Sequence, residues 1–95
     1  MGEYTVADNP EEDRYEVRDQ DGSVLGFSAY RRDGDVVVFT HTEVDESLEG
    51  QGVGSRLVRG SLDDVRASGR SVRPLCPFVR AYVDWHPEYA DLVVA

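Results

Sequence analysis

A glycine-rich segment near the middle of the chain separates two stretches with different hydrophobic periods. Before it, the β-branched residues 35–44 are typical of a central strand. After it, apolar side chains recur at helical spacing, at Val53, Leu57, Val58, Leu62 and Val65. This spacing predicts an amphipathic helix that ends near Gly69, and a short extended segment follows at residues 71–75. A strand, a helix and a second strand in this order require a right-handed parallel crossover.

The residues before the central strand predict antiparallel neighbours for it. Residues 14–19 alternate, and Asp21-Gly22 is a hairpin turn signal before a second strand at residues 24–31. A second such pair, Asp33-Gly34, leads into the central strand. Residues 1–12 show no sustained period, so they form either a frayed lead-in or a short edge strand.

The C-terminal residues predict a second helix. It starts at Pro77, a favoured first-turn residue, and ends at His86, which precedes Pro87. Trp85 and Tyr89 are expected to pack the C-terminal segment onto the sheet. The predicted fold class is α+β, with two helices, a mixed sheet that starts antiparallel and ends parallel, and the order β-β-β-α-β-α.

Charge narrows the classes of function. Nineteen acidic residues oppose ten basic ones, for a formal net charge of −9, and every basic residue is arginine. Without lysine, a Schiff-base enzyme and a Walker-type phosphate loop are excluded. The acidic field disfavours nucleic acids and membrane surfaces as partners, and it favours cationic substrates.

Length and cysteine usage set further limits. The 95 residues predict a single domain, residues 1–95, as a monomer or weak dimer. The single cysteine, Cys76, forms no internal disulfide, and no apolar run is long enough to span a membrane, so a cytoplasmic location is expected. Two histidines and one cysteine, far apart in the chain, lack the spacing of metal ligands, so no metal is predicted.

The glycine-rich segment itself predicts an anion site. Gly50, Gly52 and Gly54 alternate, and the helix that follows offers unpaired N–H groups with a partial positive charge. Pyrophosphate is one ligand for such a turn. A flexible βα loop that needs glycine only for tight turning is the alternative. The spacing differs from the G-x-G-x-x-G of a dinucleotide fold, which is therefore disfavoured.

Four segments together resemble a known family. Residues 39–44 (FTHTEV), followed by 48–58 (LEGQGVGSRLV), resemble motif A of the GNAT acetyltransferase superfamily. Residues 74–79 (PLCPFV) and 86–93 (HPEYADLV) are similar to a branch of small single-domain members called YjdJ-like N-acetyltransferases. The resemblance covers about residues 12–94, and it implies a GNAT-like fold.

The resemblance also implies a ligand and its binding residues. In the superfamily the glycine loop binds the pyrophosphate of acetyl-coenzyme A, and two parallel strands, ending here near Val44 and Leu75, part to admit the pantetheine arm. The implied cofactor-binding residues are Val44, Glu49, Gly50, Gln51, Gly52, Val53, Gly54, Ser55, Arg56, Phe78 and Tyr82. Superfamily members usually carry Arg or Gln where this chain has Glu49, so the cradle depends here on backbone N–H groups and Arg56.

Three residues are candidates for catalysis. Cys76 precedes the second helix, whose dipole favours a thiolate, so it is either an acetyl-accepting nucleophile or an acid beside the coenzyme sulfur; a buried apolar cysteine is the alternative. Strict alternation places His41 on one strand face with Phe39 and Glu43. His41 suits a general base, with a hydrogen-bonded strand histidine as the alternative, and Glu43 is a second candidate base through a water.

These observations predict an acetyl-coenzyme A-dependent N-acetyltransferase that acts on an amine, preferably a cationic one. The alternative is a coenzyme A or acyl-coenzyme A binding module with little catalysis, because so short a chain leaves the acceptor side open. An unoccupied scaffold is the third interpretation.

Overall fold

The computed structural model describes residues 4–48 and 50–94. Five strands form a single sheet in the order β1-β2-β3-β4-β5. Their bounds are β1 Thr5–Asn9, β2 Arg14–Arg18, β3 Val24–Asp33, β4 Val36–Val44 and β5 Ser71–Pro74. Neighbours from β1 to β4 pair antiparallel, whereas β4 and β5 pair parallel. The mixed sheet predicted from the sequence is confirmed.

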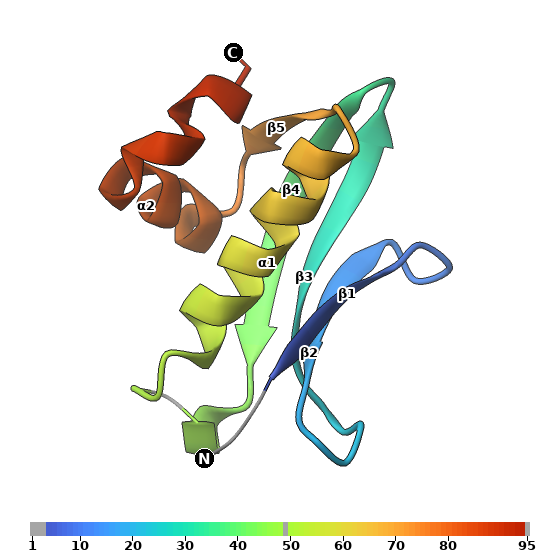
Figure 1. Cartoon of the computed structure of the whole chain (residues 1–95), viewed down its shortest axis with the longest axis vertical. Helices are drawn as coiled ribbons and strands as arrows, with labels where there is room; N and C mark the ends of the chain where they lie inside the picture. The colour runs from blue at the N-terminus through green and yellow to red at the C-terminus, as the bar shows by residue number, and fades with distance from the viewer. Residues whose placement is uncertain (1–3, 49, 95) are drawn as a thin grey trace.

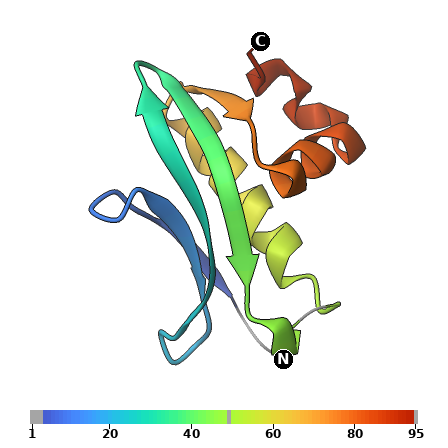
Figure 2. The same cartoon turned by 180° about the vertical axis from the view of Figure 1, so that it is seen from behind.

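The helices lie on one side of this sheet. Helix α1 (Val53–Ala67) runs across the face of the sheet, and α2 (Pro77–Trp85) lies beside it at the β5 end (Figure 1). Short 3₁₀ segments, η1 (Glu46–Leu48) and η2 (Pro87–Leu92), follow β4 and α2. Seen from behind, the sheet stands in front of α1, and no helix of the described residues crosses that second face (Figure 2). We call this second face the open face.

The first described residues form an edge strand. Val6 of β1 pairs with Val17, and its side chain packs against the hydrophobic core. The order is therefore β-β-β-β-α-β-α, with one strand more than the β-β-β start predicted from the sequence. The short-edge-strand interpretation of residues 1–12 is confirmed for β1, whose mostly polar residues hide the period of a strand. Both Asp-Gly turns lie where they were predicted, with Gly22 and Gly34 at positive φ.

Strand β4 contains a bulge that strict alternation does not predict. Ala29 pairs with His41 and Tyr30 with Phe39, so Thr40 is an extra residue on β4. The ring of Phe39 contacts Tyr15 and Tyr30 in the core, whereas His41 lies near Phe27 on the open face. The prediction that Phe39 shares a face with His41 is therefore wrong, because the extra residue inverts the alternation between them.

The core lies between α1 and the sheet. Its side chains come from every main element; among the most deeply buried are Val17, Phe39, Leu57, Leu62, Val65, Val72 and Val79. Two tyrosines join α1 to its neighbours: Tyr15 Oη donates to Asp64 at 2.7 Å, and Tyr89 Oη donates to Asp63 at 2.6 Å. Burial, followed by the bond to Asp63, raises the pKa of Tyr89 to about 12. Burial, followed by the bond to Asp64, also raises the pKa of Tyr15, so both phenols stay protonated as donors at neutral pH.

A buried carboxylate lies on the open face. Glu16, 3 % exposed, accepts hydrogen bonds from Arg18 at 2.6 Å, Arg14 at 2.8 Å and Asn9 at 3.1 Å. The bond from Arg18 holds the pKa of Glu16 below its usual range, against the opposing effect of burial. Of these three bonds, the one from Asn9 joins β1 to β2 at the outer edge of the sheet.

We expect Glu16→Gln to lower the free energy of unfolding at pH 7 by about 1–2 kcal/mol, because the amide cannot satisfy two guanidinium groups. The carboxylate stabilises the fold fully above its unfolded pKa of about 4.3, and this contribution disappears as the pH falls through the lower pKa of the folded state. Urea titrations between about pH 7 and pH 2 should therefore show a flatter acid limb in the variant. Glu12→Gln, at an exposed position, is the matched control, and an unchanged acid limb in Glu16→Gln would contradict this role.

Candidate functional site

Strands β4 and β5 separate in the middle of the sheet. Their ladder ends where Phe39 pairs with Pro74, and the N–H groups of Leu75 and Cys76 both donate to the carbonyl of Phe39. Strand β4 continues to Val44, visibly beyond the end of β5 (Figure 1). Within the described residues, the edge of β4 that faces away from β3 has no strand partner beyond Phe39. The two strands end at Val44 and Pro74, as expected from the resemblance, and they separate after Phe39.

The glycine turn begins α1 in a conformation that favours glycine. Gly50 and Gly52 have φ values of 85° and 78°, and Gly52 is the N-cap of the helix. Arg56 N–H donates to the carbonyl of Gly52 at 3.0 Å, so the N–H groups of residues 53–55 precede the first helical bond. The predicted anion cradle therefore has the backbone geometry that it requires. Glu49 lies outside the described residues.

Gly54 allows the first turns of the two helices to approach. A Cβ atom added there would lie 2.7 Å from the Cζ of Phe78 in the first turn of α2. The ring of Phe78 is 45 % exposed and lines a cavity of about 290 Å³ together with Val44, Gly50, Gly52 and Gly54. The structure thus brings Val44, the glycine turn and Phe78 together around one cavity.

Two further cavities continue this one between α1 and α2. An aromatic cavity of about 290 Å³ is lined by Ser55, Phe78, Ala81, Tyr82, Trp85 and His86. A polar one of about 200 Å³ is lined by Gly52, Ser55, Arg56, Arg59, Tyr82 and His86. Ser55 lines all three cavities, which together form what we call the α1–α2 groove. The groove runs from the C-terminal end of β4 to the C-terminal end of α2.

Cys76 lies where β4 and β5 separate. It is the N-cap of α2, is 3 % exposed and donates its thiol hydrogen to Thr42 Oγ1 at 3.3 Å. Thr42 Oγ1 also lies 2.9 Å from Ser28 Oγ, which is fully buried. The thiol therefore belongs to a short polar chain on the helix side of the sheet. The sequence reasoning did not select Thr42 or Ser28, because only the bulge at Thr40 turns Thr42 toward Cys76.

His41 and Glu43 form a pair on the open face. Their Nε2 and Oε2 atoms are 2.9 Å apart, and both side chains are more than half exposed. The carboxylate of Glu43 can only accept, so His41 Nε2 donates and Nδ1 retains its lone pair when the ring is neutral. The shared strand face predicted for His41 and Glu43 is confirmed, and it lies on the opposite side of β4 from Cys76.

Two groove residues were missed by the sequence reasoning. Arg59 lies one turn beyond Arg56 on α1, and His86 stacks on the ring of Tyr82 at a centroid distance of 3.8 Å. The i, i+3 spacing of the two arginines was a signal that they share a helix face. That His86 lines the groove depends on where α2 lies relative to α1, and no local pattern in the sequence indicates this.

The position of Trp85 differs from the predicted one. Its side chain is 82 % exposed, so it does not pack the C-terminal segment onto the sheet. It borders the aromatic cavity instead, because it lies on the face of α2 that turns away from the core. Tyr89, in contrast, is buried in the core, where it contacts Asp63 of α1 and Tyr82 of α2.

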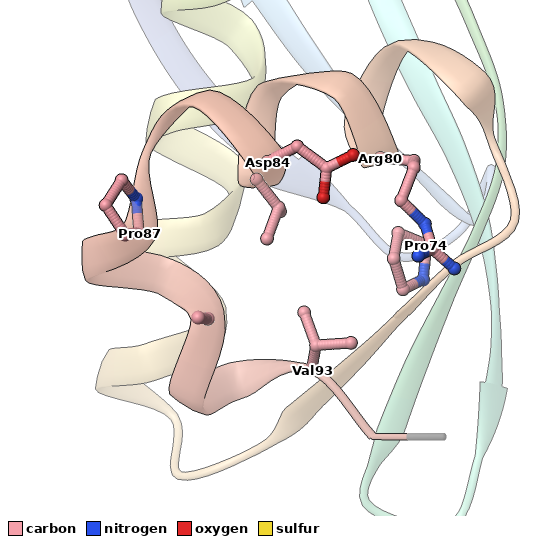
Figure 3. A pocket seen from close by; sticks show the side chains of 7 residues that line it. Pro74, Arg80, Asp84, Pro87 and Val93 are labelled. Carbon is pink, nitrogen blue, oxygen red and sulfur yellow. The ribbon is translucent and has the colours of Figure 1, made fainter.

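A separate cavity of about 330 Å³ lies between β5, α2 and η2 (Figure 3). Its walls include Pro74, Pro87 and Val93, with the charged side chains of Arg80 and Asp84 from α2 (Figure 3). None of its lining residues lines the α1–α2 groove. It therefore lies on a different side of α2 from the glycine turn.

Among residues 4–48 and 50–94, no three His, Cys, Asp or Glu side chains cluster in a way that would hold a metal ion. In the same residues, no helix combines the length and the apolar character needed to cross a membrane.

The fold and the site define an α+β protein built on one β-α-β unit, in which the glycine turn joins β4 to α1. The parallel strands of this unit, β4 and β5, separate beside the groove between the two helices. A family model described as GCN5-related N-acetyl-transferase matches residues 14–92, and the chain belongs to this family. A comparison with curated proteins gives no significant match. Among solved structures, the chain is similar to an NMR solution structure of a "GCN5-like putative N-acetyltransferase" from Staphylococcus aureus, with 23 % identity and a TM-score of 0.71. The alignment covers 96 % of this chain and 88 % of the other, which shows a shared fold.

Proposed function

We propose that this protein transfers the acetyl group of acetyl-coenzyme A to an amine. The observation that carries the proposal is the separation of β4 from β5, with the glycine turn at one end of the exposed strand edge and Cys76 at the other. Membership of the N-acetyltransferase family supports the reaction class.

The residues present fit this ligand. The N–H groups at the start of α1 and the glycines at positive φ suit a pyrophosphate, since backbone donors and the helix dipole both favour anions. The unpaired edge of β4 beyond Phe39 offers peptide groups to the amide-bearing pantetheine arm. When bound, the ligand supplies a thioester, whose acyl carbon is open to attack by an amine. In this arrangement Val44 and Phe78 line the path between the two ends.

The pair on the open face suits proton removal from an ammonium substrate. Glu43 accepts from His41 Nε2 and so orients the ring, which leaves Nδ1 to take the proton. Glu43 thus acts as a positioning residue in this proposal, rather than as the water-mediated base suggested by the sequence. Because His41 and Cys76 lie on opposite sides of β4, the base and the thiol reach the thioester from opposite directions.

Cys76 suits protonation of the departing coenzyme sulfur. Its thiol is already held as a donor toward Thr42, at the point where the strands separate. General acid catalysis by a positioned side chain typically contributes 10²- to 10⁴-fold, so this thiol is expected to matter for turnover. We therefore favour direct transfer over an acetyl-cysteine intermediate.

A cationic acceptor is supported by a further cavity. About 350 Å³ in volume, it lies between the start of β3 and the end of β4, and its walls include Phe27, Glu43, Asp45 and Glu46. It also includes Val44, which lines the glycine-turn cavity as well. Carboxylates beside an aromatic ring favour an ammonium group, as on a polyamine or a lysine side chain.

Two measurements on the same protein preparation test the proposed function. Calorimetry measures binding of acetyl-coenzyme A, and free thiol release is then followed with spermidine, a lysine peptide and a neutral amine. We expect binding, and amine-dependent thiol release that is faster with the cationic acceptors. Binding without thiol release would favour the binding-module alternative, and no binding would favour an unoccupied scaffold.

We expect His41→Gln to lower kcat at neutral pH by about a hundredfold, since glutamine cannot take up a proton. The rate should recover as the pH approaches the value at which the free amine acceptor is no longer protonated. The measurement is a pH–rate profile for both proteins with the same acceptor. A profile of His41→Gln that superimposes on that of the unmodified protein would remove His41 from the mechanism.

A further inference from the structure

Two arginines meet in one part of the α1–α2 groove. We call the polar cavity of about 200 Å³ the arginine pocket; it is lined by Gly52, Ser55, Arg56, Arg59, Tyr82 and His86. Both guanidinium groups come from the exposed face of α1, directly after the glycine turn. The pocket is a concentration of positive charge on a chain whose net charge is −9.

Four arginines elsewhere in the described residues pair with carboxylates. Arg14 and Arg18 hold Glu16, Arg66 holds Asp91, and Arg73 contacts Asp33. Arg59 forms no hydrogen bond or ion pair with another residue of the described parts of the chain. Asp63, one turn further along α1, accepts instead from Tyr89. Arg59 is therefore available to an anion from outside the chain.

The other walls of the pocket suit a phosphate ester. Arg56 lies over the ring of Tyr4 at 5.7 Å, which restrains its guanidinium group near the pocket. His86 Nδ1 donates to the carbonyl of Tyr82 at 2.8 Å, so Nε2 is the ring nitrogen left for a ligand. Phe78 and Trp85 lie in the adjoining aromatic cavity and offer flat apolar surfaces to a purine.

We propose that the arginine pocket binds the ribose 3′-phosphate of coenzyme A, and that Arg59 makes the protein select this coenzyme over its dephosphorylated form. The inference rests on the proposed function, and it assigns a third phosphate in addition to the pyrophosphate at the glycine turn. The 3′-phosphate is a monoester and carries more negative charge than either phosphate of the pyrophosphate. It is therefore the phosphate that two guanidinium groups stabilise most. The adenine then lies toward Trp85, at the C-terminal end of α2.

Titration calorimetry with coenzyme A and dephospho-coenzyme A tests the proposal. The unmodified protein is expected to bind coenzyme A about tenfold more tightly than dephospho-coenzyme A. Arg59→Gln should reduce this preference to about twofold, by weakening coenzyme A binding and leaving dephospho-coenzyme A binding nearly unchanged. Raising the salt concentration to about 0.5 M should shrink the preference of the unmodified protein, because the pocket is exposed.

Arg80→Gln is the matched control. Arg80 is an exposed helical arginine in the cavity of Figure 3, outside the groove, and its loss changes the net charge by the same amount. Arg80→Gln should leave the preference for coenzyme A over dephospho-coenzyme A at about tenfold. Equal binding of both ligands by the unmodified protein, or an equal loss for both in Arg59→Gln, would overturn this inference and leave the proposed function standing. Failure to bind either ligand would overturn both.

Discussion

Replacing Cys76 with alanine is expected to lower kcat for acetyl transfer about a hundredfold while the dissociation constant for coenzyme A stays the same. The thiol lies at the point where β4 and β5 separate and is held as a donor by Thr42. Alanine removes the donor, so the coenzyme sulfur must leave without a positioned acid. Binding depends on the glycine turn and the groove, neither of which includes Cys76. Steady-state thiol release and calorimetry measure the two quantities.

Two controls separate the roles of Cys76. Cys76→Ser keeps a hydroxyl donor and should retain more activity than Cys76→Ala if the residue acts as an acid. Mass spectrometry after mixing the unmodified protein with acetyl-coenzyme A should then show no acetyl adduct, about 42 Da, on Cys76. A stable adduct that an amine discharges would replace the acid role with that of a nucleophile. Full activity in both variants would remove Cys76 from the mechanism.

Phe39→Ala is expected to destabilise the protein by about 4 kcal/mol. Phe39 is completely buried, its ring contacts Tyr15 and Tyr30, and its carbonyl accepts the last two bonds from the β5 side. A domain of this size has a total stability of about 5–14 kcal/mol, so the variant should unfold at a much lower urea concentration. The change leaves a cavity at the position where the bulge and the strand separation meet.

Phe78→Ala serves as the control for this prediction. Phe78 is also a phenylalanine but is nearly half exposed and lines the groove, so its loss should cost about 1 kcal/mol or less of stability. Urea unfolding followed by far-UV circular dichroism measures both variants. A loss below about 1.5 kcal/mol in Phe39→Ala would show that this part of the core can collapse around the missing ring.

Much of the fold follows from local signals. Two Asp-Gly pairs predict two turns, the helical spacing from Val53 to Val65 predicts α1, and Pro77 and Pro87 bound the second helix. Each of these signals acts over a few residues, so it can be read without knowing the neighbours in space. Strand β1 has no such signal, because an edge strand that packs a single apolar side chain, Val6, against the core can be mostly polar and still pair along its whole length.

Part of the site was also predictable, because it too depends on a local signal. The glycine turn is contiguous in the chain, and its spacing predicted its backbone form. Thr42, Arg59 and His86 become candidates only when α1, α2 and β4 are assembled. Their contacts join residues that lie up to 34 positions apart.

The sequence by itself determined the β-α-β unit, the glycine turn and the absence of lysine, since periodicity and composition require no tertiary information. Only the tertiary structure decided which side chains face each other across β4. One extra residue, Thr40, inverts the alternation, so Phe39 enters the core, Thr42 meets Cys76, and His41 faces the open side. A bulge arises from pairing with a neighbouring strand and leaves no mark in the strand's own pattern, so its consequence for the site appears only when β3 and β4 are paired.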